Sequence, residues 1–505
     1  MNKVQRRILA IIPAALIQLL WLVALLGWLA PYAAFINLLL TLFALIYVLY
    51  IMVNRYEGAY KTLWLLVILG LPVFGTILYL LVGNRKTARP LQKRLAHGRS
   101  LLPKAEPPQS AAQEALAEEH PRLAQTFAYV TQKTGFATHA CEETAYYPLG
   151  ENMFARMLED LKAAEQFIFA EYFIVSNGVM WDTMVDIMAQ KAAQGVDVRF
   201  MYDDLGSIST YSEENLRQLE AKGIKCIRFN PILFIHGTIN YRDHRKMLII
   251  DGKVAYSGGV NLADEYINAV DRFGHWKDIG FRLTGPAVQN YTSMFAEFWN
   301  AFSRQPIPAS ELTVPVQSAD GRTSNGYVLS YYDSPIHRDA VSNNLYIELL
   351  SQATRYAWFY TPYLMLGDGL MDAFVRAAQR GVDVRIIMPG IPDKPLVYRM
   401  SRSYYPPLLE AGVKIYEYTP GFVHAKGCVI DDEIGTIGTV NLDYRSLFLH
   451  FENNSLFYRA PLLKELREDF AATQAMSVER TLDSMELTFT KWLFNGVLRI
   501  FAPLC

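Results

Sequence analysis

The chain has 505 residues, a formal net charge of −1 and 51% hydrophobic residues. This length exceeds one ordinary core and predicts a pair of domains with an attached segment. The near-neutral charge supplies no global attraction for nucleic acid. The four cysteines lie far apart and form no CxxC pair, so neither a disulfide framework nor a zinc knuckle is indicated, and a reducing compartment is favoured.

An apolar region comes first, and residues 8–53 carry no charge. Residues 8–29 and 32–53 are each long enough to cross a hydrocarbon layer, which takes about 20 apolar residues, and Pro31 marks the turn between them. The first run is too long for the apolar part of a cleaved signal peptide. We therefore expect two membrane spans.

A third apolar segment, residues 62–82, contains Gly70, Pro72 and Gly75, which interrupt a straight helix at its middle. It could span the membrane, re-enter it or lie in the interface. Basic residues precede the first span and follow both the second span and the third segment, with the largest group after residue 84. By the positive-inside rule, the bulk of the chain is expected in the cytoplasm.

The composition divides the chain into five parts, of which residues 1–83 are the apolar helices. Residues 84–125 predict a basic linker with some helix, whose beginning either lies against anionic head groups or is merely solvated. Residues 126–310 and 311–482 are two halves that repeat each other. Residues 483–505 are an amphipathic segment, which either lies in the membrane interface or packs on the rest of the protein.

The two halves share an order of strands and helices. FIFAEYFIV, from Phe167, and YAWFYTPYLM, from Tyr356, are typical strands, and a helical pattern and a near-identical phrase, AAQGVDVRFMY or AQRGVDVRIIM, follow each. Alternating strands and helices predict βαβ units. We expect an α/β fold with two tandem halves related by a pseudo-twofold axis, each a mixed, parallel-rich sheet flanked by helices.

Each half also contains a longer signature: HRKMLIIDGKVAYSGGVN at 244–261 and HAKGCVIDDEIGTIGTVN at 424–441. In both, a Lys follows the His by two residues, an Asp by seven, a Gly by fourteen and an Asn by seventeen. Chance would give two full matches on the order of once in a million sequences. MLIID and GCVID predict short strands, which places His and Lys on one face and the Asp at a hairpin turn, where it shapes the motif.

If the halves pack about the pseudo-twofold axis, His244 and His424 meet across one small site. Two lysines and two asparagines would surround them: Lys246, Lys426, Asn261 and Asn441. An ammonium group beside each His disfavours zinc. Lysines and amides suit a tetrahedral oxyanion, and a phosphoryl group fits best. One His could attack phosphorus while the other protonates the departing alkoxide, in interchangeable roles.

The doubled signature, HxKxxxxDx6GxxN, resembles the HKD motif of the phospholipase D superfamily. Over nearly its whole length the chain is similar to the bacterial cardiolipin synthases of that superfamily, including VILGLPVFGTILYLLVGN at Val67, YDDLGS at Tyr202, HWKDIGFRLTGPAV at His275, SRSYY at Ser401 and NLDYRSLFLHFENN at Asn441. The resemblance implies a multi-pass phosphatidyltransferase of the bacterial inner membrane, with its catalytic part in the cytoplasm. It would make cardiolipin and glycerol from two phosphatidylglycerol molecules through a phosphohistidine, without a nucleotide, metal or other cofactor.

The resemblance also carries the family's roles onto this chain, with His244 as nucleophile and His424 as acid and base. The implied catalytic residues are His244, Lys246, Asp251, His424, Lys426 and Asp431, and the implied substrate-binding residues are Asn261, Asn441 and Glu452. Glu452 and Asp278 could orient the histidines, although Asp278 could equally form a surface ion pair. Ala263 and Asp443 stand where simpler members often have Ser, which puts the polarity around the first motif in doubt.

Other aromatic and histidine residues carry weaker expectations. Tyr172 and Tyr363 occupy corresponding strands and either line the head-group pocket or belong to the aromatic core. Four histidines have no counterpart in the repeat and are interpreted as structural or surface residues: His236, His275, His337 and His450.

Three other functions are compatible with parts of this pattern. A phospholipase D hydrolase would use water as the acceptor, which the motif itself does not select. A nuclease would use the same histidine pair, but the apolar N-terminal region and the lack of a basic stripe with interleaved aromatic residues argue against nucleic acid as a partner. A membrane scaffold would need a degenerate motif, whereas both copies are intact.

Overall fold

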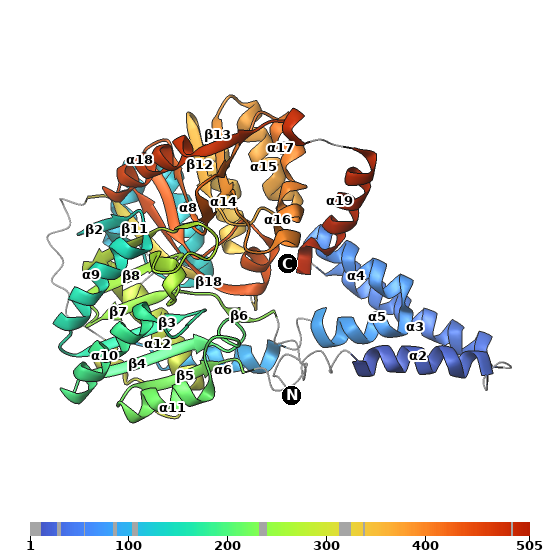
Figure 1. Cartoon of the computed structure of the whole chain (residues 1–505), viewed down its shortest axis with the longest axis horizontal. Coiled ribbons are helices and arrows are strands. Elements are labelled where there is room, and N and C mark those ends of the chain that lie inside the picture. The colour runs from blue at the N-terminus through green and yellow to red at the C-terminus, as the bar shows by residue number, and fades with distance from the viewer. Residues whose placement is uncertain are drawn as a thin grey trace.

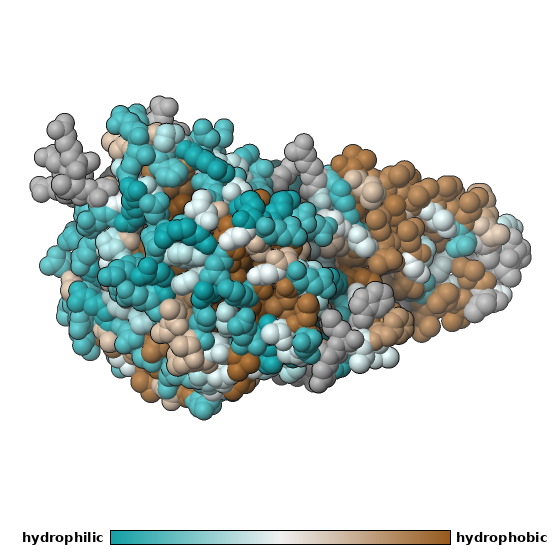
Figure 2. Space-filling model, turned by 90° about the horizontal axis from the view of Figure 1, so that it is seen from above, coloured by the Kyte–Doolittle hydropathy of each residue, from teal (hydrophilic) through white to brown (hydrophobic). Residues whose placement is uncertain are grey.

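The computed structural model describes residues 12–27, 32–54, 56–83, 88–103, 110–231, 240–312, 325–336, 339–485 and 488–504. Its apolar N-terminal part consists of α2 (Ile12–Gly27), α3 (Ala33–Val53), α4 (Gly58–Gly70), α5 (Pro72–Leu78) and the π-helix η1 (Tyr79–Gly83). These helices project from one side of an α/β body (Figure 1), and their surface is mostly hydrophobic whereas that of the body is mostly hydrophilic (Figure 2).

Within the described residues, one stretch, Ala34–Val53, is long and apolar enough to cross a membrane. It matches the second predicted span. The first predicted span is described only in part, because residues 8–11 and 28–29 lie outside the described residues.

The third apolar segment is bent, as its sequence predicts. α4 ends at Gly70, Leu71 leaves the helical region (φ −135°, ψ 75°), and Pro72 begins α5. At Gly75 a Cβ atom would lie 2.3 Å from the Val67 carbonyl oxygen, so the backbone of α5 lies directly against that of α4. A larger residue would force the two helices apart, and the bend therefore depends on this glycine.

The basic region that follows forms helices α6 (Arg89–Ser100) and α7 (Ala111–Glu119), and α8 (Pro121–Thr134) comes next. α6 lies so close to α12 (Val288–Phe302) that a Cβ atom at Gly98 would be 2.2 Å from the Glu297 carbonyl oxygen. Leu95 and Leu116 are buried. The expected helices are present, and they pack against the body.

The first half contains a sheet with the strand order β2-β10-β8-β7-β3-β4-β5, flanked by helices (Figure 1). Its strands are β2 (Thr144–Tyr147), β3 (Phe167–Tyr172), β4 (Asp197–Asp203), β5 (Lys225–Phe229), β7 (Met247–Ile250), β8 (Val254–Gly258) and β10 (Gly280–Thr284). The flanking helices include α9 (Gly150–Ala163), α10 (Val179–Ala193), α11 (Glu213–Ala221) and α12.

The second half contains a sheet with the order β1-β11-β18-β17-β16-β12-β13-β14-β19. Its strands are β1 (His139–Ala140), β11 (Tyr327–Asp333), β12 (Tyr356–Tyr360), β13 (Asp383–Pro389), β14 (Lys414–Tyr418), β16 (Gly427–Ile430), β17 (Ile434–Gly438), β18 (His450–Tyr458) and β19 (Ser477–Arg480). The helices include α14 (Val341–Gln352), α15 (Asp368–Gln379), α16 (Pro395–Arg402), α17 (Tyr405–Glu410) and α18 (Leu462–Ala475).

The strand orders of the two halves match. The run β5-β4-β3-β7-β8-β10-β2 corresponds to β14-β13-β12-β16-β17-β18-β11, which confirms the repeat. The sheets are mixed, as predicted. Along these runs, however, parallel pairing is confined to β3-β4-β5 and β12-β13-β14, and the remaining pairs are antiparallel. The expectation of parallel-rich sheets fails outside these strands, because the signature strands fold back as hairpins.

The halves are joined by strands that pair across them. β1 comes from the first half of the chain but extends the second sheet. β6 (Arg242–Asp243) pairs in parallel with the start of β18, and β9 (His275–Lys277) pairs in parallel with β15 (Gly421–Val423). The apolar core is continuous across the halves, with the rings of Phe281 and Phe457 5.3 Å apart.

Candidate active site

Each signature His directly follows a short strand that pairs with the other half. His244 follows β6, and its N–H donates to the Phe451 carbonyl oxygen at 2.9 Å. His424 follows β15, and its N–H donates to the Lys277 carbonyl oxygen at 2.7 Å. The chain then crosses back into its own sheet through β7 or β16. Residues 244–246 and 424–426 therefore form the crossing and are not part of a regular strand, which corrects the predicted placement of His and Lys.

Each imidazole is held by a carboxylate of the opposite half. Nδ1 of His244 lies 2.8 Å from Oε2 of Glu452, and Nδ1 of His424 lies 2.7 Å from Oδ2 of Asp278. Both carboxylates have no solvent exposure, so the alternative of a surface ion pair for Asp278 is wrong. Because the carboxylate accepts Nδ1–H, each neutral imidazole keeps its lone pair on Nε2.

Aromatic rings fix the planes of the two imidazoles. The ring of Phe173 meets His244 edge to face at 4.8 Å, and that of Tyr266 meets His424 in the same way at 5.3 Å. The ring of His450 lies 5.9 Å from that of His244. His450 is buried, so of the two expectations for this residue, structural or surface, the surface one is wrong.

The two signature lysines are buried and form no salt bridge within the described residues. Nζ of Lys246 donates to the carbonyl oxygen of His244 at 2.7 Å, and Nζ of Lys426 donates to that of His424. Each lysine is 1% exposed. Within the described residues neither ammonium group forms an ion pair, so the site has a place for an anion.

Burial lowers the pKa values of the signature lysines, and nearby carboxylates oppose this shift. Burial lowers the pKa of Lys246 to about 8 and that of Lys426 to about 7. Burial and the neighbouring Lys426 lower the pKa of His424 to about 4, and burial and Lys246 hold the pKa of His244 well below its ordinary value. A bound anion would reverse the part of each shift that comes from the lysines.

The two carboxylates behave differently. Burial raises the pKa of Glu452 well above its ordinary value. Burial acts in the same direction on Asp278, but His424 and Lys426 outweigh it and hold the pKa of Asp278 below its ordinary value. The two histidines therefore have carboxylate partners whose pKa values are shifted in opposite directions.

The signature asparagines differ in their bonding. Asn261 accepts the Ile174 N–H at 3.0 Å through Oδ1, and its amide nitrogen donates to the Tyr266 hydroxyl at 2.8 Å. Asn261 thus supports the ring that packs on His424. Oδ1 of Asn441, in contrast, is buried and has no hydrogen-bond partner among the described residues.

The signature aspartates lie at the hairpin turns, where Asp251 and Asp431 both have φ 54°. The carboxylate of Asp251 accepts the backbone N–H groups of residues 165–167 at 2.7–2.9 Å. That of Asp431 accepts those of residues 354–356 at 2.7–2.8 Å. These bonds attach each motif hairpin to the beginning of β3 or β12.

Several other predicted residues also have clear positions. Tyr172 is buried in the core, whereas Tyr363 is half-buried and donates to Asp393 at 2.6 Å. His275 bonds to the Tyr418 hydroxyl at 3.0 Å. His236 and His337 lie outside the described residues. Sequence reasoning missed Asn453, whose Oδ1 accepts the backbone N–H of Lys246 at 3.0 Å. Its position directly after Glu452 could have indicated a place in the site.

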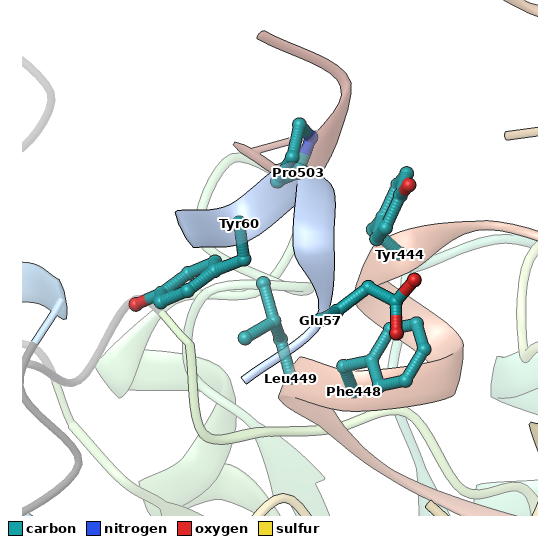
Figure 3. Close-up of a pocket in the computed structure, with 6 residues that line it drawn as sticks. All are labelled: Glu57, Tyr60, Tyr444, Phe448, Leu449 and Pro503. Carbon is teal, nitrogen blue, oxygen red and sulfur yellow. The ribbon is translucent and has the colours of Figure 1, made fainter. Parts of the chain in front are cut away.

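The N-terminal helices meet the C-terminal end of the chain at a small cavity (Figure 3). A cavity of about 10 Å³, enough for about one water molecule, is lined there by α4, by the π-helix η5 (Arg445–Leu449) and by the turn η7 (Ala502–Leu504), through Glu57, Tyr60, Tyr444, Phe448, Leu449 and Pro503. η5 leads directly into His450 and β18. The apolar helices are therefore joined to the segment that carries Glu452.

Comparison with known proteins agrees with this geometry. Residues 157–299 and 346–473 match the family described as "Cardiolipin synthase, PLD-like domain", and residues 39–84 match the family described as "Phospholipase_D-nuclease N-terminal". In fold, the chain resembles the phosphatidylserine synthase of Haemophilus influenzae, with a TM-score of 0.56 over 75% of this chain and 98% of that one. At 14% identity, this likeness concerns the fold alone.

Several relatives align over most of the chain. An uncharacterised protein of Streptococcus mutans is 41% identical over 461 residues, which cover 90% of this chain and 99% of that protein. A cardiolipin synthase of Alkalihalophilus pseudofirmus is 35% identical, with 81% and 82% of the two chains covered, and one of Halalkalibacterium halodurans is 34% identical, with 88% of each covered. This chain therefore belongs to the cardiolipin synthase family of phospholipase D-like enzymes.

Proposed function

We propose that the protein transfers a phosphatidyl group from one phosphatidylglycerol to another, giving cardiolipin and glycerol. The observation that carries this proposal is the pair of buried imidazoles, each held by a carboxylate of the opposite half, beside two buried ammonium groups that form no salt bridge within the described residues. A phosphodiester supplies the missing negative charge, and its phosphorus needs one nucleophile and one acid.

In the first step, Nε2 of His244 attacks the phosphorus of the first lipid. A P–N bond forms, the P–O bond to glycerol breaks, and His424 gives a proton to the departing alkoxide. In the second step, neutral His424 takes the proton from a glycerol hydroxyl of the second lipid. The new alkoxide attacks phosphorus, the P–N bond breaks, and cardiolipin leaves with His244 restored.

The assignment of the two roles follows the family resemblance, and the unequal carboxylates support it. Ionised Asp278 favours the protonated form of His424, as the acid role requires. No comparable stabilisation acts on His244, which stays neutral and nucleophilic. Lys246 and Lys426 bind the phosphoryl oxygens, and their charge is offset when the phosphodiester arrives, which raises the pKa of His424 toward the working range.

The remaining signature residues have supporting roles in this proposal. Asn441 offers a free amide oxygen within the site, and Asn261 positions Tyr266 against His424. Glu452 orients His244. Asp251 and Asp431 hold the motif hairpins in place and do not touch phosphate.

The membrane arrangement completes the proposal. Residues 8–29 and 32–53 span the bacterial inner membrane, and the bent α4–α5 segment re-enters it from the cytoplasmic side. This places the basic groups before, between and after these segments on one side, together with the body that contains the active site. The enzyme then meets phosphatidylglycerol at the inner surface and uses no nucleotide, metal or nucleic acid.

The test uses the full-length protein in vesicles that contain labelled phosphatidylglycerol and EDTA, beside His244→Ala, His424→Ala and the control His275→Ala. We expect equimolar cardiolipin and glycerol from the parent and the control, and neither product from the other two variants. Phosphatidic acid in place of cardiolipin would make the protein a hydrolase. No lipid turnover by the parent would refute a lipid substrate.

A further inference from the structure

A basic groove lies on the second half, away from the histidines. It is formed by α16, the turn η6 (Asp483–Met485) and the C-terminal helix α19 (Phe489–Phe501), and it has a volume of about 470 Å³. Its lining is polar and cationic, with Tyr398, Arg399, Arg402, Ser484, Met485, Lys491 and Asn495. We refer to this feature as the α16–α19 groove.

Two of the three cations in this groove come from successive turns of α16. Within the described residues Arg399 forms no ion pair, and its guanidinium lies 4.2 Å above the ring of Phe494. Nε of Arg402 lies 3.4 Å from a carboxylate oxygen of Glu417, and Glu417 also binds Arg480. Lys491 adds a third positive charge from α19. Among the described residues the two arginines of α16 therefore have one carboxylate, Glu417, which they share with Arg480.

The rim of the groove is apolar on the side of α19. One face of this helix is fixed to the body, where Leu498 is buried and Arg499 donates to Ser403. The other face exposes large side chains: Phe489, Leu493, Phe494, Val497 and Phe501. α19 and the turn η7 also pack against α4 (Figure 1). The exposed face therefore continues the apolar surface of the N-terminal helices.

We propose that the α16–α19 groove binds the phosphate of an anionic glycerophospholipid while α19 lies in the surface of the membrane. The head-group phosphate meets Arg399, Arg402 and Lys491, and the acyl chains follow the apolar face of α19 into the bilayer. This lipid is held and does not react. The proposal rests on the membrane location proposed above, but not on which lipid reaction the histidines catalyse.

One short path connects the groove to the reacting site through α19 and η7. At the other end of α19, Leu504 accepts a hydrogen bond from Arg445 at 2.9 Å, and Arg445 lies 3.4 Å from His450 beside His244. A lipid in the groove would therefore set the depth at which the site faces the membrane.

The experiment measures binding and not turnover. The full-length protein carries His244→Ala, so that bound lipid is not consumed. It is titrated in neutral detergent with short-chain phosphatidylglycerol or phosphatidylcholine. The number of lipid molecules that stay bound is then counted by native mass spectrometry. The groove variant adds Arg399→Gln, Arg402→Gln and Lys491→Gln. The matched control adds Arg217→Gln, Lys253→Gln and Lys464→Gln, which are more than half exposed and do not line the groove.

We expect the groove variant to bind phosphatidylglycerol more weakly by about tenfold or more, since each charge near an anionic surface contributes about fivefold. The matched control should keep the parent's affinity, and phosphatidylcholine should bind weakly throughout. Equal phosphatidylglycerol affinity in the groove variant and the parent overturns the proposal. Displacement of the lipid by inorganic phosphate at a matching concentration would show a site for free phosphate and also overturns it. If the triple variant does not fold, Lys491→Gln alone should lose about fivefold.

Discussion

Replacement of Asp278 by Asn tests whether this carboxylate of the first half positions His424 of the second half. Oδ2 of Asp278 accepts Nδ1–H of His424, and Oδ1 accepts the Ile279 N–H at 2.9 Å and lies against Gly259, where a Cβ atom would come within 2.0 Å. Asn has the same shape, so it fits this tight position. It removes the charge that stabilises the imidazolium, and its NH2 group can turn toward Nδ1 and move the lone pair away from Nε2.

The size of the effect follows from what is lost. A hydrogen bond to a charged group contributes about 1.5–3 kcal/mol, and a positioned acid or base contributes about 10²–10⁴ in rate. We expect Asp278→Asn to lower kcat for cardiolipin formation by about 10²–10³. KM should change by less than about threefold, because the lysines still hold the phosphoryl group.

The assay is cardiolipin formation by the full-length protein in phosphatidylglycerol vesicles, with kcat and KM measured across pH. Asp160→Asn is the matched control, because Asp160 is also buried but binds Arg282 and Tyr256, at 2.7 and 2.5 Å, and none of the repeated His, Lys, Asp or Asn residues. A folded Asp278→Asn variant with kcat within about twofold of the parent would falsify the positioning role.

Three further outcomes are expected. Asp251→Ala should lower the free energy of unfolding by roughly 3 kcal/mol, at about 1 kcal/mol for each of three lost backbone bonds; a denaturant midpoint equal to the parent's would contradict this. As the pH rises through about 7 and 8, Lys426 and Lys246 lose their protons, so kcat/KM should fall mainly through KM; a flat profile from pH 6 to 9 would count against phosphate binding by these lysines. Gly75→Val should open the α4–α5 bend, because its Cβ would lie 2.3 Å from the Val67 carbonyl oxygen; unchanged labelling of single cysteines in α5 by a membrane-impermeant reagent would argue otherwise.

Local chemistry made much of the fold predictable. The repeat of His, Lys, Asp and Asn at equal spacings required two equivalent hairpins, and the strand orders of the two halves agree. Asp251 could be assigned to a turn, because Asp followed by Gly favours a hairpin, and it does lie there with φ 54°. Gly70 and Pro72 predicted the bend between α4 and α5, since both residues disfavour a continuous helix.

Contacts between the halves were predictable only in part: Glu452 and Asp278 were expected near the histidines, but not which carboxylate holds which histidine. Asp278 and Glu452 stand at different distances in sequence from their signature Asn residues, so the repeat does not pair them. Their equivalence arises only when β9 meets β15 and β6 meets β18. His450 was missed for the same reason, because it has no counterpart in the first half and reaches His244 through the start of β18.

The crossed pairing explains why two copies of the signature make one site. A buried imidazole needs an acceptor for its Nδ1–H, and within each half the signature supplies none: Asp251 is occupied by backbone N–H groups. The acceptor comes from the other half, on the strand that also bonds to the backbone of the signature His. The active site is thus complete only when the two halves pack together. One partner is an aspartate with a lowered pKa, and the other is a glutamate with a raised pKa. The two histidine–carboxylate pairs therefore depart from the twofold symmetry, and this difference allows two similar histidines to take different roles in proton transfer.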